Sequence, residues 1–435
     1  MKKVIFWFRR DLRLNDNHGL FQALNNCENV IPIFIFDKDI LGYFNDPKDA
    51  RVSFIHDRLT SINEDLQSSN SALKTYCKKP LEAFKEIVEE FDIDAVYCNK
   101  DYEPRSRHRD EKVKDFLFSK GVDFYSYKDH VIFEEMEITK ADGGPYTVFT
   151  PYKNKWLENF QDSDCKSYKS EKLKDNFLKL KKENIISLKE MGYEKSSIEI
   201  PKAQIQKKKL SDYNEKRDFP AVDGTSLQGI HLRFGTISIR EYIKKAKDIN
   251  DTWLSELIWR EFYSQILFNF PKAATSEFKE KYSAIPWKKK EDAKEDFEKW
   301  KNGMTGYPLV DAGMRELNET GHMHNRVRMV VASFLIKHLL IDWREGERYF
   351  ANKLLDYDLA SNNGNWQWAA GCGCDAAPYF RVFNPTSQLK KFDKELKYVK
   401  KWVPEVETDD YPEPMVDHKF ARERVLEVYK ESLKN

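Results

Sequence analysis

The chain has 435 residues, of which 40% are apolar and 33% are charged, a composition typical of a water-soluble globular protein with more than one domain. It carries 73 Lys and Arg against 72 Asp and Glu, so the net charge gives no argument for nucleic-acid binding, and any basic surface must be local. No stretch approaches the roughly 20 apolar residues of a membrane span, and the start has too few apolar residues for a signal peptide. We therefore expect a cytoplasmic protein that makes no contact with a membrane.

The six cysteines contain no CxxC pair, which disfavours a zinc ribbon or a thioredoxin-type site. Cys372 and Cys374 form a lone CxC without a second pair of ligands, and we interpret them as small packing side chains. No metal site is expected.

Short apolar runs alternate with helical segments in the first part of the chain. The runs typical of buried parallel strands are Val4–Phe8, Val30–Phe36, Ile93–Cys98 and Val122–Tyr127, and the predicted helices between them are His18–Leu24, Leu81–Phe91 and Asp110–Ser119. Alternation of this kind predicts an α/β fold, a doubly wound domain with a parallel sheet, over residues 1–130. This part of the sequence contains no glycine-rich phosphate loop.

The rest of the chain divides by periodicity. Residues 131–210 are rich in lysine and serine with weak periodicity, which predicts an interdomain connector with short helices. Residues 211–435 show apolar spacing near 3.6, which predicts an all-α domain. Its predicted helices are Ile239–Ala246, Thr252–Phe268, Ala293–Trp300, Pro308–Leu317, Arg326–Leu340, Glu345–Leu355 and Phe420–Leu433.

The stretch Asp356–Pro385 differs most from its Lys- and Glu-rich surroundings. It begins with two acids, Asp356 and Asp358, and continues to Trp366 and Trp368. On a helix these two indoles project about 200° apart, so that one can face an interior while the other lines a cavity. The alternative is that both indoles are ordinary residues of an apolar core and neither lines a cavity. Acids, amides and indoles together suit a flat, hydrogen-bonding aromatic ring better than an apolar core.

Two further pairs share a helical face. Glu256 and Trp259 are spaced i,i+3 and form either a surface pair or the wall of a pocket that stacks a base. Asn325 and Met329 are spaced i,i+4, so that an amide and a thioether share one face of a helix. They form either part of a binding site or the ordinary start of a helix. The loop Gly224–Ser226 precedes a predicted helix and offers hydroxyls and amides to a phosphate, although such loops are common.

Taken together, these motifs resemble the photolyase/cryptochrome superfamily, and specifically the class I cyclobutane pyrimidine dimer DNA photolyases. The resemblance covers essentially the whole chain, in the order and spacing of the family. The matching segments are WFRRDLRLNDN (Trp7–Asn17), RDFPAVDGTS (Arg217–Ser226), ELIWREFY (Glu256–Tyr263), TGHMHNRVRM, LIDWREGERYF and DLASNNGNWQWAAGCGCDAAPYFRVFNP.

The resemblance implies blue-light-driven repair of cyclobutane pyrimidine dimers in DNA by electron transfer from excited FAD, active in its reduced anionic form, to a flipped-out dimer. The implied FAD contacts are Tyr213, Thr225, Ser226, Trp253, Arg260, Arg328, Asp356, Asp358 and Asn362. The implied substrate and DNA contacts are Arg217, Glu256, Trp259, Asn325, Arg326, Met329, Trp368, Arg381, Gln388 and Lys390. Glu256, Asn325 and Asn362 are implied to take part in catalysis. An electron relay is implied for Trp366, Trp343 and Trp287.

The chain also departs from the family pattern. His322 stands where the family usually has Trp or Tyr, and Leu227–Gly229 replaces a segment that usually offers a hydroxyl to the phosphate side of FAD. After Glu103 the chain lacks the glutamate of folate-binding relatives, so folate bound in that manner is not expected as an antenna chromophore. A deazaflavin, another flavin or no antenna at all stay open.

Other functions stay open from the sequence. A cryptochrome-type photoreceptor would keep FAD and the relay without repairing DNA. A six-four photolyase would place histidines at Asn325 and Met329, and a flavin oxidoreductase would need a nicotinamide site, for which we see no motif. We expect a monomer whose partner is UV-damaged DNA containing cyclobutane dimers.

Overall fold

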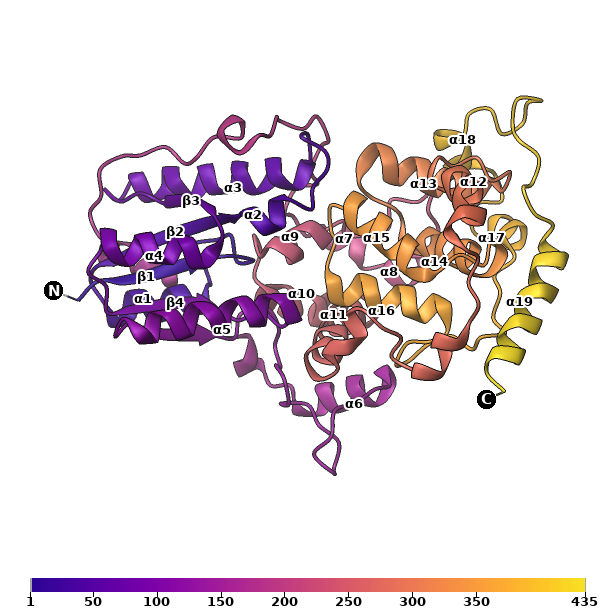
Figure 1. The fold of residues 1–435 in the computed structure, drawn as a ribbon. Coiled ribbons are helices and arrows are strands. Elements are labelled where there is room, and N and C mark those ends of the chain that lie inside the picture. The colour runs from indigo at the N-terminus through magenta and orange to yellow at the C-terminus, as the bar shows by residue number, and fades with distance from the viewer. Residues whose placement is uncertain (1, 435) are drawn as a thin grey trace. The chain divides into compact units, whose positions relative to one another are not determined.

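The computed structural model describes residues 2–434, and contact density divides them into two units (Figure 1). The first unit contains the chain up to residue 138, residues 155–204 and residues 227–248. The second contains residues 139–154, residues 205–226 and the chain from residue 249 onward. The segment 131–210, predicted as a connector, contributes to both units. The predicted domain boundaries at residues 130 and 210 therefore stay predictions.

The first unit is built on a five-stranded parallel sheet in the order β3-β2-β1-β4-β5. The strands are β1 (Val4–Phe8), β2 (Val30–Asp37), β3 (Lys74–Lys78), β4 (Ala95–Asn99) and β5 (Asp123–Tyr127). The helices are α1 (His18–Asn26), α2 (Lys38–Leu41), α3 (Ala50–Gln67), α4 (Pro80–Glu90), α5 (Pro104–Ser119), α9 (Gly229–Phe234) and α10 (Ile239–Ile249). Alternate residues of β1 enter separate cores, Phe6 and Phe8 on one face and Ile5 and Trp7 on the other. The predicted doubly wound parallel sheet is confirmed.

The edge strand β3 and the long helix α3 are among the elements of this unit that the sequence analysis does not predict. The edge strand β3 reads KTYCK and is half-exposed throughout, since lysines at a sheet edge interrupt the apolar run that marks a buried strand. The helix α3 spans 18 residues with polar side chains spread through it. The other strands begin and end within two residues of their predicted limits.

The segment 131–210, predicted as a connector with short helices, is partly buried in the fold. It contains the helix α6 (Phe149–Asn159) and several short 3₁₀ turns. Trp156 and Phe177 are almost fully buried, and the amide of Leu178 donates to the carbonyl of Val30 at 2.9 Å. This pairing at the start of β2 fastens the segment to the sheet, although its helical periodicity is weak.

The second unit is helical, which confirms the predicted all-α fold of this part. Its helices are α7 (Lys207–Leu210), α8 (Tyr213–Lys216), α11 (Asp251–Asn269), α12 (Lys290–Lys301), α13 (Pro308–Thr320), α14 (Asn325–Ser333), α15 (Trp343–Lys353), α16 (Leu359–Ala370), α17 (Pro385–Phe392), α18 (Lys397–Trp402) and α19 (His418–Ser432). The helix α14 runs on into a π-helical turn, Phe334–His338. The prediction of one continuous helix over Arg326–Leu340 merges these two.

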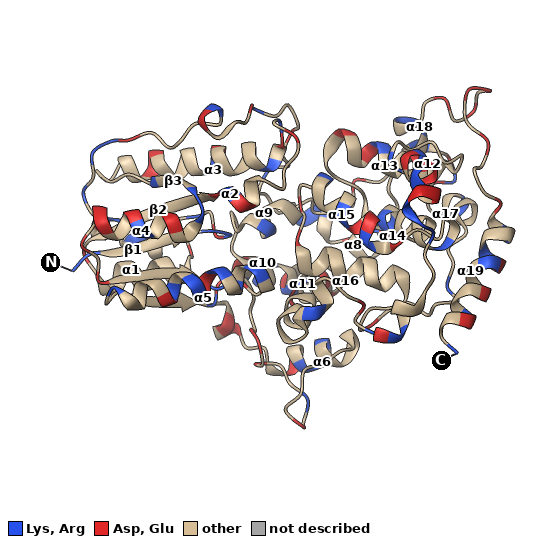
Figure 2. Ribbon diagram, in the orientation of Figure 1, with Lys and Arg blue, Asp and Glu red and all other residues tan. Residues whose placement is uncertain are grey.

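Positively and negatively charged residues are interspersed along the helices of both units, as the ribbon colours of α5, α12 and α19 illustrate (Figure 2). This pattern agrees with the near-equal numbers of acidic and basic residues. Among the helices of residues 2–434, none has the length and apolar character needed to cross a bilayer.

Candidate functional site

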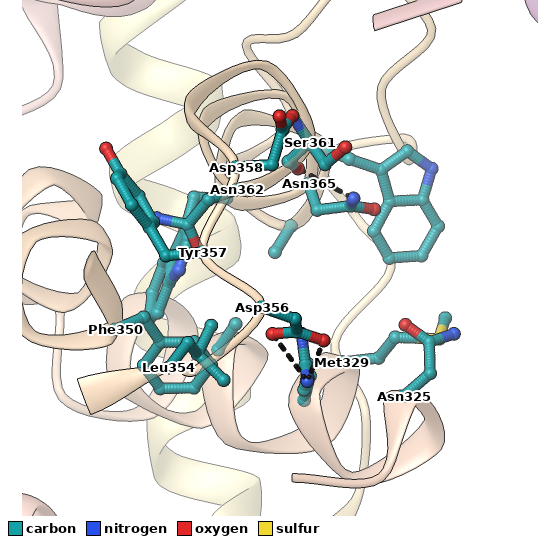
Figure 3. A pocket seen from close by; sticks show the side chains of 15 residues that line it. Asn325, Met329, Phe350, Leu354, Asp356, Tyr357, Asp358, Ser361, Asn362 and Asn365 are labelled. Carbon is teal, nitrogen blue, oxygen red and sulfur yellow. Dashed lines mark hydrogen bonds and ion pairs between the residues drawn. The ribbon is translucent and has the colours of Figure 1, made fainter. Parts of the chain in front are cut away.

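A cavity in the second unit is lined by α14, the end of α15, the turn that follows it, and α16 (Figure 3). Its empty space, the open mouth included, is about 590 Å³. Eight predicted site residues line it: Asn325, Arg328, Met329, Asp356, Asp358, Asn362, Trp366 and Trp368. The other lining residues are Ala332, Phe350, Leu354, Tyr357, Ser361, Asn365 and Ala369.

Helix α16 forms one wall of the cavity and is held from several sides. Asp358 caps its N-terminus by accepting a hydrogen bond from the amide of Ser361 at 3.0 Å. Gly364 faces the ring of Tyr263 on α11, where an added Cβ would lie 2.3 Å from Cδ1. Gly346 of α15 likewise leaves room for the indole of Trp366, because its Cβ would lie 2.2 Å from Cη2. Small residues therefore let three helices approach closely and fix the position of α16.

The polar end of the cavity is an ion pair between Arg328 and Asp356. The guanidinium Nη2 donates to Oδ2 at 3.0 Å and to Oδ1 at 3.2 Å, and Nε donates to the carbonyl of Met323 at 2.7 Å. Burial raises the pKa of Asp356, but the charge of Arg328 outweighs it, so the net pKa lies below the ordinary value. A fixed cation and a fixed anion side by side can bind the donor and acceptor edge of a planar ring.

The side chain of Asn362 has a single consistent orientation. Its Nδ2 donates to the carbonyl oxygen of Glu347 at 3.1 Å and to the carboxylate Oε1 of the same residue at 2.8 Å. Both partners are acceptors, so the amide nitrogen must face them, which leaves Oδ1 as an acceptor for other groups. Burial raises the pKa of Glu347, although the hydrogen bond from Asn362 acts in the opposite direction.

Glu347 is a site residue that reasoning from the sequence missed. It lies 15 residues before Asn362 on a different helix, and only the packing of α15 against α16 brings the two together. Its one signal in the sequence is an acid placed directly after Gly346, on a helix otherwise rich in charge.

The two tryptophans of α16 have different surroundings. Trp366 is 2% exposed and packs edge-to-face on Phe350 at 5.1 Å and on Trp300 at 6.3 Å. Trp368 is half-buried, with Phe383 stacked at 6.5 Å. Trp366 therefore joins the core and the cavity wall, whereas Trp368 offers a partly open aromatic surface.

Asn325 and Met329 lie together on one side of the cavity, and Phe350, Leu354 and Tyr357 lie on the other (Figure 3). Asn325 is exposed and Met329 is half-buried, so these two form the outer rim. A flat ligand seated against Arg328 and Asp356 would therefore leave room for a second group at the rim.

Glu256 and Trp259 of α11 are not part of the cavity lining. Glu256 forms an ion pair with Arg217, and the neighbouring Asp218 forms an ion pair with Arg326 at 2.8 Å. The indole of Trp259 stacks on Phe149 with 3.6 Å between ring centroids. Phe149 thus covers one face of Trp259, and Phe262 and Tyr263 contact the same indole with 5.5 and 5.4 Å between ring centroids.

The remaining predicted site residues also lie outside the lining of this cavity. Trp253 and Trp343 are buried, Trp287 is half-buried with its ring 6.2 Å from that of Tyr429, and Arg381 and Lys390 are exposed. Tyr213, Thr225, Ser226, Arg260 and Gln388 are half-buried. Within residues 2–434, no group of three or more His, Cys, Asp or Glu is arranged to hold a metal ion.

Known proteins match both units. Residues 4–171 match the family model of DNA photolyase, and residues 253–409 match the FAD binding domain of DNA photolyase. A protein of Agrobacterium fabrum named deoxyribodipyrimidine photo-lyase is 36% identical over 98% of this chain and 97% of its own length.

Two solved structures have a similar fold. A bacterial class III photolyase from Agrobacterium tumefaciens is 33% identical with a TM-score of 0.84, covering 100% of this chain and 98% of its own. An archaeal photolyase from Sulfolobus tokodaii, solved with two FAD molecules, is 34% identical with a TM-score of 0.80, covering 99% of this chain and 100% of its own. Membership of class I stays a prediction, but identity at this level over nearly the whole length confirms the predicted superfamily: the chain belongs to the DNA photolyase family.

Proposed function

We propose that this protein uses blue light and reduced FAD to split cyclobutane pyrimidine dimers in DNA. The observation that carries the proposal is the cavity that brings Arg328, Asp356 and Asn362 together with Asn325, Met329 and Trp368. The first three suit the edge of a flavin, and the last three suit two linked pyrimidines at the rim.

The donor and acceptor set of the cavity fits an isoalloxazine ring. Arg328 offers N–H groups to ring carbonyl oxygens, and the ionised Asp356 offers an acceptor to ring N–H groups. The Oδ1 of Asn362, free because Glu347 occupies the amide nitrogen, can accept a hydrogen bond from a reduced ring nitrogen. When bound, FAD supplies the electron that light makes available for dimer splitting.

The rim offers contacts that can replace the base stacking that a dimer loses when it leaves the DNA helix. Aromatic platforms are worth about 1–3 kcal/mol per stacked base, and Trp368 presents such a surface. Asn325 can hydrogen-bond the edge of a pyrimidine, and Met329 adds a polarizable apolar contact. Glu256 would then hydrogen-bond the dimer or donate a proton to the dimer anion.

Two groups of residues would support this reaction from further away. The exposed Arg381 and Lys390 would neutralise backbone phosphates and make binding depend on salt. Trp366 and Trp343 are buried in one core, and Trp287 is half-buried, an arrangement that supports a relay from cavity to surface in that order.

The test is light-driven loss of dimers from a thymine-dimer oligonucleotide incubated with the FAD-loaded, photoreduced protein. We expect loss under blue light, none in the dark, and a collapse of activity in the double variant Glu256→Ala/Asn325→Ala. Glu295→Ala, an exposed change on α12, is the control and should keep full activity. Normal photoreduction of FAD with intact dimers would refute the proposal and favour a light sensor, and repair of a six-four photoproduct instead would reassign the substrate.

A further inference from the structure

Four charged side chains outside the cavity form two ion pairs that share one loop. Arg217 pairs with Glu256 of α11, and the next residue, Asp218, pairs with Arg326 of α14, with Nη2 and Oδ1 2.8 Å apart. The side chains are between 18% and 39% exposed, so solvent and solutes can reach all four. Consecutive residues of opposite charge therefore tie together two helices that carry predicted substrate contacts.

The other two positively charged residues predicted to contact DNA differ from these arginines in their pairing. Arg381 and Lys390 are exposed and form no ion pair within residues 2–434. They are available to any phosphate without breaking a contact of the protein. Arg217 and Arg326, by contrast, are each occupied by a carboxylate in the free protein.

We propose that Asp218 and Glu256 suppress the binding of undamaged DNA by occupying Arg326 and Arg217. A backbone phosphate must displace a carboxylate from each guanidinium and lie close to the negative charge that it displaces. This inference rests on the proposed function, because it takes the arginines as phosphate contacts.

The two carboxylates differ in what they gain when DNA binds. Asp218 is 39% exposed, so the displaced group returns to water, and its ion pair lowers the affinity for every DNA equally. Glu256 finds a new hydrogen-bonding partner only in a pyrimidine dimer turned out of the helix. An intact duplex keeps its bases stacked and offers Glu256 nothing, so the Arg217–Glu256 pair opposes undamaged DNA more than damaged DNA.

The first test measures the dissociation constant of the FAD-loaded protein for an undamaged duplex, in the dark and over a series of salt concentrations. We expect Asp218→Asn to bind the undamaged duplex about two- to fivefold more tightly, the scale of a partly exposed ion pair. The slope of log affinity against log salt should steepen by about one phosphate contact. Glu405→Gln is the matched control, because it removes the same charge from a comparably exposed pair with Arg315, and it should leave both quantities unchanged.

The second variant, Glu256→Gln, separates this inference from general charge effects. We expect its affinity for the undamaged duplex to rise while its affinity for the dimer-containing duplex falls. If Asp218→Asn binds undamaged DNA no more tightly than Glu405→Gln does, or if Glu256→Gln weakens binding to both duplexes, the inference is overturned. Wild-type protein that repairs dimers alongside such results would leave the proposed function intact, and wild-type protein that binds no DNA would overturn both.

Discussion

The close contact of α16 with α11 makes a sharp prediction for Gly364→Ala. The added Cβ would lie 2.3 Å from Cδ1 and Cε1 of Tyr263, which is 1.1 Å short of the 3.4 Å at which ordinary contact begins. Tyr263 is buried between Trp259 and Phe262, so its ring has little room to turn. Most of the missing distance must come from a shift of α16 itself.

The expected cost follows from two opposing effects. Overpacking a core costs about 1–3 kcal/mol, and replacing glycine by alanine inside a helix returns about 1 kcal/mol. We expect a net loss of up to about 2 kcal/mol in the free energy of unfolding, which lowers Tm by at most a few degrees. The functional loss should be larger, because Asn362 moves with the helix and a displacement of about 1 Å in a positioning group can cost about 100-fold in rate.

Three measurements test this reasoning: the Tm, the FAD content of the purified protein, and the rate of dimer repair. Tyr263→Ala removes the clashing ring and serves as the partner in a double-mutant cycle. The double variant should lose less free energy of unfolding than the two single variants lose together, because the alanine methyl group fills space that the ring vacates. Additive losses, or a Gly364→Ala protein with wild-type FAD content and repair rate, would show that α16 does not transmit the contact to the cavity.

Three further results are expected. Glu347→Gln keeps the shape of the side chain but replaces a charged acceptor by a neutral amide that also carries a donor, so only the backbone carbonyl of residue 347 still holds the amide of Asn362 firmly. The spectrum and photoreduction rate of bound FAD should change at unchanged FAD content, and an identical spectrum and rate would count against the role of Glu347. Asp356→Asn leaves Arg328 without its anionic partner and should weaken FAD binding about 10- to 100-fold in equilibrium dialysis, corresponding to about 1–3 kcal/mol for a charged hydrogen bond. Burial lowers the pKa of His322 from 6.5 to about 4, so the unfolded chain takes up a proton at a higher pH than the folded protein does. As the pH is lowered from 6.5 to 4, the free energy of unfolding should therefore fall, by at most about 1.4 kcal/mol per pH unit from this group. In urea titrations, His322→Gln should flatten this dependence on pH.

The sequence alone indicated those parts of the fold and site whose signal is local. The buried strands Val4–Phe8 and Val30–Asp37 are continuous apolar runs, whereas the edge strand Lys74–Lys78 is not, because one side of it faces water. The stretch that begins at Asp356 shows most of its cavity residues within a single turn and helix, and the family resemblance adds those of α14.

Contacts between distant segments could not be found in this way. The Asp218–Arg326 pair joins residues 108 apart, and the hydrogen bond from Asn362 to Glu347 joins residues 15 apart. The first depends on how a loop packs against a helix, and the second on how two helices pack. A lone acid or amide in the sequence is indistinguishable from a solvated surface group. The residues that orient and restrain the site are therefore harder to predict than those that line it.

Helix α16 explains why the most unusual stretch of the chain carries small residues beside its functional ones. With 3.6 residues per turn, Asn362, Trp366 and Ala369 fall on the face that lines the cavity. On another side Gln367 is buried and donates to the carbonyls of Ala273 and Ser276 at 2.9 and 3.1 Å, which holds the helix to the segment after α11. A helix held by α11, by α15 and by the segment after α11 can yield mainly toward its open side, which is the cavity. Any added volume next to α16 is therefore passed to the cavity, so glycine and alanine in this helix protect the geometry of the site as directly as Asn362 provides its chemistry.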